Sequence, residues 1–304
     1  MWASRSIAAI LSPSRLRTAL LIALMLLGGA PAGHAWEDTP PLHIYYVAYP
    51  VEWNGKTIMI GARLQLPAEA TGKLPAVIMM HGTSGLSYRG VYYAAALNRA
   101  GIATLEIDQW GGRGLPAGAS SRPKRLGDML PDVAGAYRLL SERPDIDVSR
   151  LGLMGSSMGG IQTMLMMTHR ESDAILGQNV HLKAAVAFYP ICWLYNHVPG
   201  ADFDNLGDAP LRIFVGSNDD YDGGQAACEA LLHSLAPGDA ALVSMRAFAG
   251  ATHEFDVFDG PHEFNDPGAN RRKGGVIHVR PDVEARQQAR DDLTQFFATA
   301  LKSP

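Results

Sequence analysis

LGLMGSSMGGIQTML, residues 151–165, is the stretch that decides the fold. Its first four residues form an apolar run typical of a strand covered on both faces, and its last seven residues are typical of a buried helix. Between them stands a G-x-S-x-G motif with Ser157 at its centre. The five-residue pattern alone is weak evidence, because glycine and serine are frequent in this chain. Its position between a strand and a helix gives it weight.

A sharp turn from strand to helix explains the residues around Ser157. Side chains two positions before and after the serine would collide in such a turn, which favours Gly155 and Gly159. The turn raises the serine hydroxyl above the sheet and directs the amide of Met158 at the oxygen of an attacked carbonyl. An ordinary Gly/Ser turn, with Ser157 as a helix cap, is the alternative interpretation.

Apolar runs recur on both sides of this turn, and nearly all are continuous, as in strands of a parallel sheet. The runs that predict strands are 45–51, 57–66, 76–80, 103–107, 151–154, 184–188, 213–215 and 242–248. The amphipathic segments that predict helices are 91–99, 128–140, 159–169, 225–235 and 283–301. This alternation predicts an α/β fold with a doubly wound, mostly parallel sheet. Its first two strands are expected to be antiparallel and joined at Asn54-Gly55.

One stretch does not fit the alternation. Residues 258–275 are rich in glycine and contain prolines and a basic cluster at 271–273. We expect an irregular loop there, and loops of that length are usually functional lids or mobile excursions.

The first 35 residues differ from the rest of the chain. They contain three arginines and no acidic residue, then an apolar run at 19–27, then small residues up to Ala35. This is the layout of a secretory signal peptide cleaved before Trp36. An uncleaved anchor is the alternative, although the apolar run is shorter than the roughly 20 residues of a membrane span. We expect a signal peptide at 1–35, a single domain at 36–304, and a periplasmic or secreted protein.

Composition and charge exclude several classes of protein. With 47% hydrophobic and 18% charged residues, the chain is typical of a globular protein rather than a disordered one. The net charge of −4 and the lack of a basic stripe argue against nucleic-acid partners. No pair of histidines has the spacing of a zinc motif such as H-E-x-x-H, so we do not expect a zinc site. The hydrolysis expected below requires neither a metal nor an organic cofactor. The oligomeric state is not predicted.

A serine hydroxyl needs a base, and the base needs an orienting acid. In this sheet architecture both follow the nucleophile along the chain, in the order serine, acid, histidine. His253 fits the base, because it lies in a glycine-bearing loop just after the last expected strand. Three aspartates follow the preceding strand; we expect Asp219 to be the acid, with Asp222 second. Surface charge is the alternative for the others.

An oxyanion hole completes the constellation. The run Met79-Met80-His81-Gly82-Thr83-Ser84-Gly85 follows the strand expected at 76–80. Such a loop supplies the second backbone donor in this architecture, so we expect the amides of Thr83 and Met158 to hold the oxyanion. A glycine-rich loop that merely turns the chain is the alternative.

Taken together, these motifs resemble the dienelactone hydrolase family, a branch of the α/β-hydrolases. The resemblance extends from about residue 44 to residue 298 and rests on the stretches 80–85, 107–114, 155–160, 188–190, Gly216 with Asp219, and 250–253. It implies a hydrolase of esters or lactones that acts through Ser157, His253 and Asp219. The namesake enzymes use a cysteine nucleophile, and this chain has a serine. The departure favours a general carboxylesterase over a dienelactone hydrolase.

Four side chains are candidates for the substrate pocket. Arg113 would suit a substrate carboxylate, although arginines in such loops more often hold the loop. Trp110, Tyr189 and Trp193 follow strand ends and would line an apolar acyl pocket, with core packing as the alternative.

The chain has two cysteines, Cys192 and Cys228, both expected at the same end of the sheet. In an exported protein we expect a disulfide, which would close a loop of about 36 residues and stabilise the fold by roughly 3–4 kcal/mol. Two buried free thiols are the alternative.

The sequence therefore predicts a secreted serine hydrolase that cleaves small-molecule carboxylic esters or lactones through an acyl-enzyme. A peptidase or acyltransferase with the same triad remains open, because fold does not fix function. A catalytically silent binding protein that keeps the fold is the third hypothesis. The acyl and alcohol specificity is not predicted.

Overall fold

The computed structural model describes residues 40–178 and 180–302. The signal peptide expected at residues 1–35 lies outside this range. Within it, no helix has both the length and the apolar character that crossing a membrane requires.

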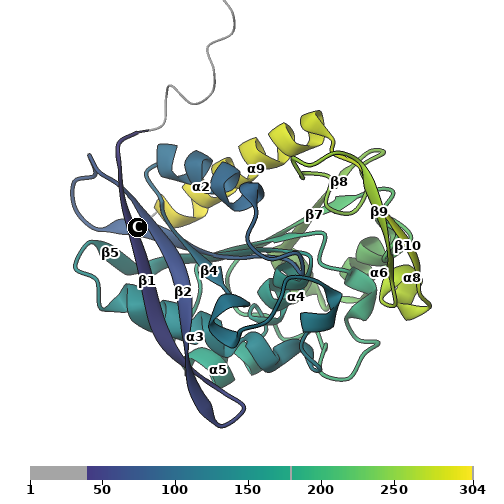
Figure 1. The fold of residues 1–304 in the computed structure, drawn as a ribbon, viewed down its shortest axis with the longest axis horizontal. Helices are drawn as coiled ribbons and strands as arrows, with labels where there is room; N and C mark the ends of the chain where they lie inside the picture. Colours follow the sequence, from purple (N-terminus) through teal and green to yellow (C-terminus); the bar gives the residue numbers. More distant parts are fainter. Residues whose placement is uncertain (1–39, 179, 303–304) are drawn as a thin grey trace, which may run out of the picture. The chain divides into compact units, whose positions relative to one another are not determined.

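One eight-stranded sheet organises the described chain (Figure 1), in the order β1-β2-β4-β3-β5-β6-β7-β8. The strands are β1 (Leu42–Trp53), β2 (Lys56–Pro67), β3 (Leu74–Met80), β4 (Ala103–Asp108), β5 (Ile146–Ser156), β6 (Ala184–Phe188), β7 (Leu211–Gly216) and β8 (Val243–Phe248). The pairs β1–β2 and β2–β4 are antiparallel, and all other neighbours are parallel. The predicted α/β class, with antiparallel strands at its start, is confirmed.

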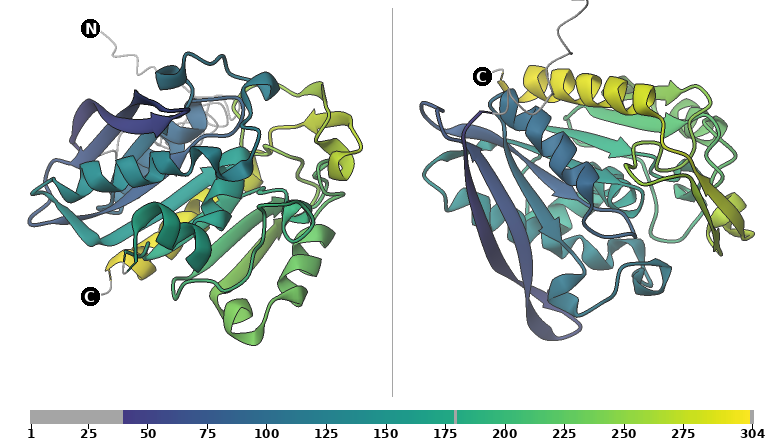
Figure 2. Two further views of the ribbon diagram at one scale, coloured as in Figure 1. Left: turned by 90° about the horizontal axis from the view of Figure 1, so that it is seen from below. Right: turned by 45° about the horizontal axis from the view of Figure 1, so that its top comes forward.

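Helices cover both faces of the sheet. They are α2 (Tyr88–Arg99), α3 (Pro131–Ser141), α4 (Met158–Leu165), α5 (His169–Leu176), α6 (Ala226–Ser234), α7 (Pro237–Leu242) and α9 (Val283–Lys302). Short 3₁₀ turns are η1 (Gly111–Arg113), η2 (Ala119–Ser121), η3 (Leu126–Met129) and η4 (Cys192–Leu194). The helices α2 and α9 lie side by side over the sheet (Figure 2). Their apolar residues form one core with one face of the sheet, and those of α3, α4 and α6 form the other core.

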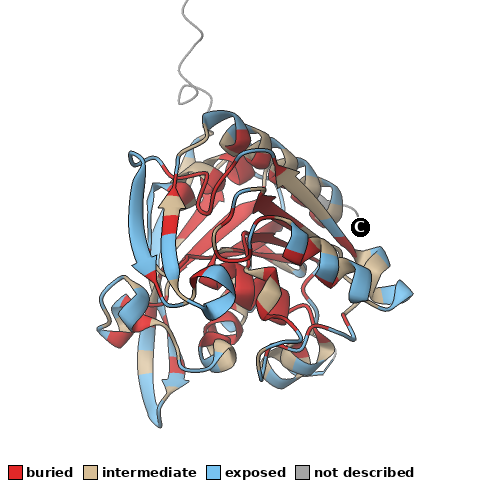
Figure 3. Ribbon diagram, turned by 90° about the vertical axis from the view of Figure 1, so that its right-hand side faces the viewer, coloured by how far each residue is buried: buried red, intermediate tan, exposed pale blue. Residues whose placement is uncertain are grey.

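The central strands alternate between these two cores. In β3, Val77 and Met79 face the α2–α9 side, whereas Ile78 and Met80 face the α3–α4 side. All seven residues of β3 are buried, which explains its continuous apolar sequence. The edge strand β1 is exposed over most of its length, so the buried residues concentrate in the middle of the sheet (Figure 3).

The turn between β1 and β2 forms where the sequence predicts it. Asn54 and Gly55 both have positive φ, 51° and 72°, as a two-residue hairpin turn of this kind requires.

The helix predicted at 159–169 is wrong in its length. The structure divides this region into α4 and α5, because Thr168 leaves the helical conformation and its hydroxyl accepts a hydrogen bond from the Glu171 amide. That bond is a helix N-cap, so Thr168 begins a new helix instead of ending the first one.

The irregular loop predicted at 258–275 is also wrong. The structure contains a separate antiparallel hairpin there, with β9 (His262–Asp266), the short α8 (Ala269–Arg272) and β10 (Gly275–Val279). Four of the five residues of β9 are exposed, so the strand lacks the alternating apolar pattern by which a half-buried strand is recognised. Ile277 and Val279 of β10 are buried and anchor the hairpin.

Candidate active site

Ser157 occupies a strained turn between β5 and α4. Its φ of 52° and ψ of −113° lie in a region that a non-glycine residue adopts only under constraint. The Ser157 amide donates to the Phe188 carbonyl at 2.9 Å, which ties the turn to β6. A Cβ atom on Gly159 would lie 2.6 Å from the Met80 carbonyl oxygen, and one on Gly155 would overlap the Gly159 carbonyl. The two glycines therefore let the turn fit against the neighbouring backbone.

The structure brings together the three side chains expected to act as nucleophile, base and acid. The Nε2 atom of His253 lies 3.0 Å from the Ser157 hydroxyl, and its Nδ1 atom lies 2.7 Å from an Asp219 carboxylate oxygen. All three side chains are buried. Since a carboxylate only accepts hydrogen bonds, Nδ1 carries the proton and Nε2 is free to accept the one on Ser157.

Asp219 rather than Asp222 contacts the histidine. Asp219 stands in the turn after β7, where its other carboxylate oxygen accepts the Tyr221 amide at 2.9 Å. Asp222 instead accepts the Trp193 amide at 3.3 Å. Burial and the neighbouring Asp219 carboxylate raise the pKa of Asp222 to about 7.

The surroundings of His253 favour its protonated form once a proton arrives. Burial by itself disfavours the imidazolium, but the adjoining Asp219 carboxylate and the nearby Glu254 raise the pKa of His253 above its ordinary value. The rings of Tyr189 and Tyr221 pack against the imidazole, with centroids 4.8 Å and 4.4 Å away. These contacts hold the ring between Ser157 and Asp219.

Two backbone amides are available beside Ser157. Met158 is the first residue of α4, so its N–H has no partner within the helix. In the described chain no backbone acceptor pairs with the Thr83 N–H in its turn after β3. A Cβ atom on Gly82 would lie 3.3 Å from the Cβ of Ser157, which places this turn against Ser157.

His81 sets the direction of the Thr83 amide. The Gln109 amide donates to Nε2 of the His81 ring at 3.0 Å, so Nδ1 must carry the proton and donate to the Gly82 carbonyl at 2.7 Å. Burial lowers the pKa of His81, which keeps this tautomer neutral. The Gly82 carbonyl and the Thr83 N–H belong to one planar peptide unit, so fixing the first orients the second.

A cavity of about 330 Å³ opens beside Ser157. One part of its wall is apolar, and its residues include Met158, Ile161, Ile191, Leu194 and Val198. The other part carries four cationic side chains, those of Arg122, Lys124, Arg125 and Arg272, and no carboxylate lines the cavity. Lys124 and Arg272 have no ion-pair partner in the described chain.

Arg113 does not reach this cavity, which corrects the expectation that it contacts a substrate. Its side chain is fully buried and forms two hydrogen bonds to Asp132, of 2.9 Å and 2.7 Å. A third bond, to the Gln109 carbonyl, fixes the loop after β4. Arg113 is therefore a structural residue.

The three aromatic candidates also lie outside the cavity wall. The Trp110 indole donates to the Thr83 carbonyl at 3.1 Å, and the Tyr189 hydroxyl donates to Asp256 at 2.8 Å. Trp193 stacks on His197, with ring centroids 5.1 Å apart. None of the three rings is among the residues that line the cavity, whose apolar wall includes aliphatic side chains and Met158.

Two polar networks near the site have no counterpart in the sequence analysis. In the first, Arg122 contacts Thr83, Tyr221 and Asp266. In the second, the Ser84 hydroxyl donates to Glu254 at 3.3 Å, and Arg89 donates to both of them. No local motif marks either network, because its members are far apart in the chain.

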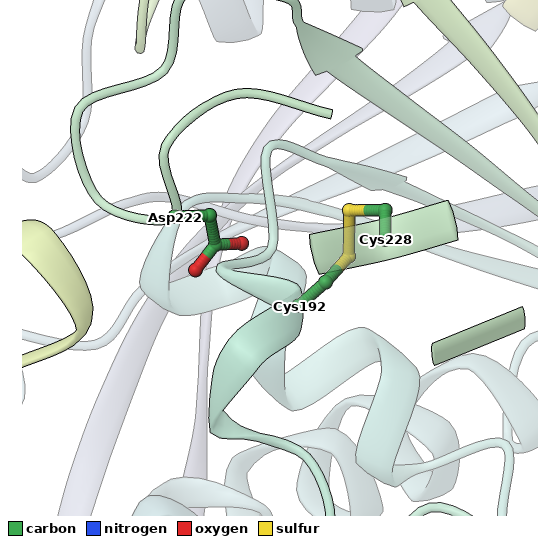
Figure 4. Close-up of side chains that lie close together, drawn as sticks. All are labelled: Cys192, Asp222 and Cys228. Carbon is green, nitrogen blue, oxygen red and sulfur yellow. A yellow bond between two sulfur atoms is a disulfide. The ribbon is translucent and has the colours of Figure 1, made fainter. Parts of the chain in front are cut away.

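Cys192 and Cys228 form the expected disulfide, which joins η4 to α6. Asp222 lies beside it (Figure 4), and ligand atoms of these three residues are within 4.8 Å of one another. The sulfur atoms are bonded to each other, so neither is available as the thiolate that a metal ion would need. This group is not a metal site in the oxidised protein.

Comparisons with known proteins show what the chain is similar to. The family Hydrolase_4, described as serine aminopeptidase S33, matches residues 73–220. An uncharacterized protein of Mycobacterium tuberculosis is 26% identical over 163 residues, and the match spans 51% of this chain and about half, 56%, of that protein.

Solved structures show the same fold. A putative dienelactone hydrolase from Klebsiella pneumoniae aligns with a TM-score of 0.59 and 19% identity, over 84% of this chain and 99% of that one. An esterase from Pyrobaculum calidifontis aligns with a TM-score of 0.59 and 14% identity, over 97% and 95%. These alignments show that the chain has the α/β-hydrolase fold.

Proposed function

We propose that the protein is a serine hydrolase of carboxylic esters, with Ser157 as nucleophile, His253 as general base and Asp219 as the orienting acid. The observation that carries the proposal is the continuous hydrogen-bonded chain from Ser157 through His253 to Asp219, at 3.0 Å and 2.7 Å. The match to a hydrolase family and the esterases among the structural neighbours support it.

The reaction would proceed through an acyl-enzyme. As the Ser157 oxygen bonds to the ester carbonyl carbon, its proton passes to Nε2 of His253 and the carbonyl electron pair moves onto oxygen. The amides of Thr83 and Met158 would hold that oxyanion. The imidazolium then protonates the departing alcohol, and a water molecule repeats the sequence to release the acid.

The charge of the cavity favours an ester over the substrate of an aminopeptidase. An aminopeptidase must accept the positively charged end of a peptide. Arg122 and Arg125 are paired with Asp266 and Asp128, but Lys124 and Arg272, which are unpaired in the described chain, would repel that end from a wall without a carboxylate. The same wall suits an ester with an apolar portion beside the scissile bond and a negatively charged group further out. Comparing one preparation on such an ester and on an unblocked peptide amide separates the two activities.

The decisive variant is Ser157→Ala, with the exposed Ser141→Ala as its control. We expect Ser157→Ala to lose hydrolysis of a short p-nitrophenyl ester and labelling by a fluorophosphonate, while Ser141→Ala keeps both. Ester hydrolysis that survives in Ser157→Ala would refute the assignment. A wild-type protein that neither hydrolyses esters nor takes the label would instead support a silent binding protein.

We further propose that residues 1–35 are a signal peptide and that residues 36–304 form the exported domain. The buried disulfide supports this, because disulfides persist in oxidising compartments outside the cytosol. N-terminal sequencing of the exported protein should begin at Trp36, whereas an intact Met1 would contradict cleavage.

A further inference from the structure

Arg122 joins three segments that converge on the proposed catalytic site. It follows η2 and directs its guanidinium at the turn after β3, where Nε donates to the Thr83 hydroxyl at 3.2 Å. Its two terminal nitrogens donate to both carboxylate oxygens of Asp266, at the end of β9, one of them at 2.8 Å. One terminal nitrogen also donates to the Tyr221 hydroxyl at 3.3 Å. We call Thr83, Arg122, Tyr221 and Asp266 the Arg122 clamp.

Asp266 accepts most of the hydrogen bonds of the clamp. Its side chain is fully buried, and it also accepts the Tyr221 hydroxyl at 2.7 Å and the Gly268 amide at 2.6 Å. Although burial opposes ionisation, the hydrogen bonds from Arg122 and Tyr221 hold the pKa of Asp266 at about 2. A buried carboxylate with this many donors stays charged and keeps the guanidinium in place.

Each segment held by the clamp carries a part of the proposed machinery. Thr83 supplies one oxyanion amide. Tyr221 follows Asp219 by two residues, and its ring packs against His253. The hairpin β9–β10 contributes Asp266 and, through Gly268 and Arg272, a wall of the cavity beside Ser157.

The Thr83 turn is held at different points by different groups. His81 fixes the peptide plane before Thr83, and the indole of Trp110 with the Gly118 amide fixes the carbonyl after it. Arg122 holds the Thr83 side chain through its hydroxyl and itself lines the cavity, so we expect this contact to affect how closely Thr83 approaches the reacting carbonyl. Small errors in the position of an oxyanion donor weaken the transition state more than the ground state.

We infer that Arg122 is a positioning residue, which holds Thr83 so that its amide meets the oxyanion. The inference rests on the proposed function of Ser157. Arg122 also lines the cavity and its side chain is 29% exposed, so two other roles compete with this one: binding a charged part of the substrate, and general support of the fold.

The experiment compares Arg122→Gln with Arg143→Gln. Arg143 is a matched control, because it forms a similar two-pronged pair with Asp145 and is 23% exposed, just before β5 and away from the site. The assays are hydrolysis of p-nitrophenyl acetate, a small neutral ester, and the rate at which a fluorophosphonate labels Ser157. The phosphoryl oxygen of that probe must enter the oxyanion hole, so its rate reports on the hole without a known substrate.

We expect Arg122→Gln to lower kcat and the labelling rate about 10- to 100-fold, less than the full loss of an oxyanion donor, with KM changed less than about threefold. Arg122→Lys should recover part of kcat, because it keeps the charge beside Asp266 but cannot bridge both partners. A rise in KM at constant kcat would assign Arg122 to substrate binding and overturn the inference. Losses no larger than those of Arg143→Gln would also overturn it.

A double-mutant cycle separates positioning from loss of folding. Thr83→Val removes the hydroxyl that Arg122 holds but keeps the amide. The double variant should have a kcat no lower than that of Arg122→Gln alone. A kcat lowered by the product of the two single effects would contradict an action of Arg122 through the Thr83 hydroxyl. If Arg122→Gln fails to fold because Asp266 is left unpaired, Arg122→Gln with Asp266→Asn removes both charges and takes its place.

Failure of the inference and failure of the proposed function differ in the wild type. If wild-type Ser157 is neither labelled nor active, the proposed function fails. If the wild type is active and the Arg122 variants match the Arg143 control, only the positioning role fails.

Discussion

His253 and Glu254 are adjacent in sequence, but their side chains contact different groups. The imidazole contacts Ser157 and Asp219, while the Glu254 carboxylate turns back to Ser84 and Arg89. Glu254 has a positive φ of 52°, which reverses the chain just after the histidine. Its charge nevertheless reaches the ring and is one of the causes that raise the pKa of His253.

This neighbour gives a prediction for the pH profile. Activity needs neutral His253, so it should fall as the pH drops through a pKa above the ordinary 6.5. Glu254→Gln removes an anion that favours the imidazolium, so the pKa should fall and the acid limb of kcat/KM should move to lower pH, by about 0.3–1 unit. The profile is measured with a neutral ester between about pH 5 and 9, where a histidine titrates. The exposed Glu142→Gln serves as control; an unmoved or upward-moving limb in Glu254→Gln would contradict the electrostatic coupling.

Arg113 shows that the partner of a single side chain cannot always be predicted from the sequence. Its position in a loop after a strand is compatible with a substrate contact and with a buried ion pair. The choice depends on Asp132, which lies 19 residues further on at the start of α3 and accepts both prongs of the guanidinium. Spacing along the chain gives no sign of that partnership. The contact of Ser157, His253 and Asp219 was easier to predict, because in this architecture the three residues follow predicted strands in a fixed order.

Among the helices and strands, those with strong local signals were predicted well. The strands β3 and β6 are continuous apolar runs, and the β1–β2 turn has its Asn-Gly pair. Errors arose where a signal was short or polar. Thr168 and Glu171 have the spacing of a helix cap, but Thr168 lies inside the amphipathic stretch 159–169, which concealed it. The hairpin β9–β10 is held by Asp266 and by a few buried aliphatics, so periodicity could not reveal it.

The disulfide between η4 and α6 gives a prediction about stability. It closes a loop over 36 positions, and the restriction of the unfolded chain predicts a contribution of about 3–4 kcal/mol. The variant with both Cys192→Ala and Cys228→Ala should lose that much free energy of unfolding in urea. Its Ser157 labelling at room temperature should stay within about threefold of wild type, because neither sulfur belongs to the triad. A decrease in the free energy of unfolding of less than about 1 kcal/mol, with an unchanged slope of that free energy against urea concentration, would contradict the loop-closure account.

For the molecule as a unit, the sheet explains why residues 157, 219 and 253 can meet at all. The strands β5, β7 and β8 are parallel to their neighbours, so the turns that follow them lie at one edge of the sheet. The Arg122 clamp uses the same edge, but one of its contacts joins residues 144 positions apart. No ordering rule covers such a contact, and it became visible only in three dimensions.

The cavity beside Ser157 differs in charge from the molecule as a whole. The chain has a net charge of −4, yet the cavity beside Ser157 has four cationic side chains and no carboxylate. Arg272 is presented to the cavity from a turn in which Asn270, Arg271 and Arg272 all have positive φ. Such conformations cost about 1–3 kcal/mol each and persist only where other contacts enforce them. Here the Asp220 and Tyr221 carbonyls do so, by accepting the amides of Asn270 and Arg271.

A local positive field in a negative molecule predicts an effect of salt that depends on the substrate. For a singly negative ester such as a p-nitrophenyl hemisuccinate, kcat/KM should fall about three- to tenfold as ionic strength rises from about 0.01 M to 0.5 M, because the screening length shrinks from about 30 Å to less than 10 Å. A neutral p-nitrophenyl ester of similar length should show little change. Lys124→Gln should weaken the salt dependence of kcat/KM for the negatively charged ester only. Lys56 is exposed at the start of β2, and Lys56→Gln should leave that salt dependence as in the wild type. Equal salt dependence for both esters would mean that the four cations serve the fold or the surface and do not attract the substrate.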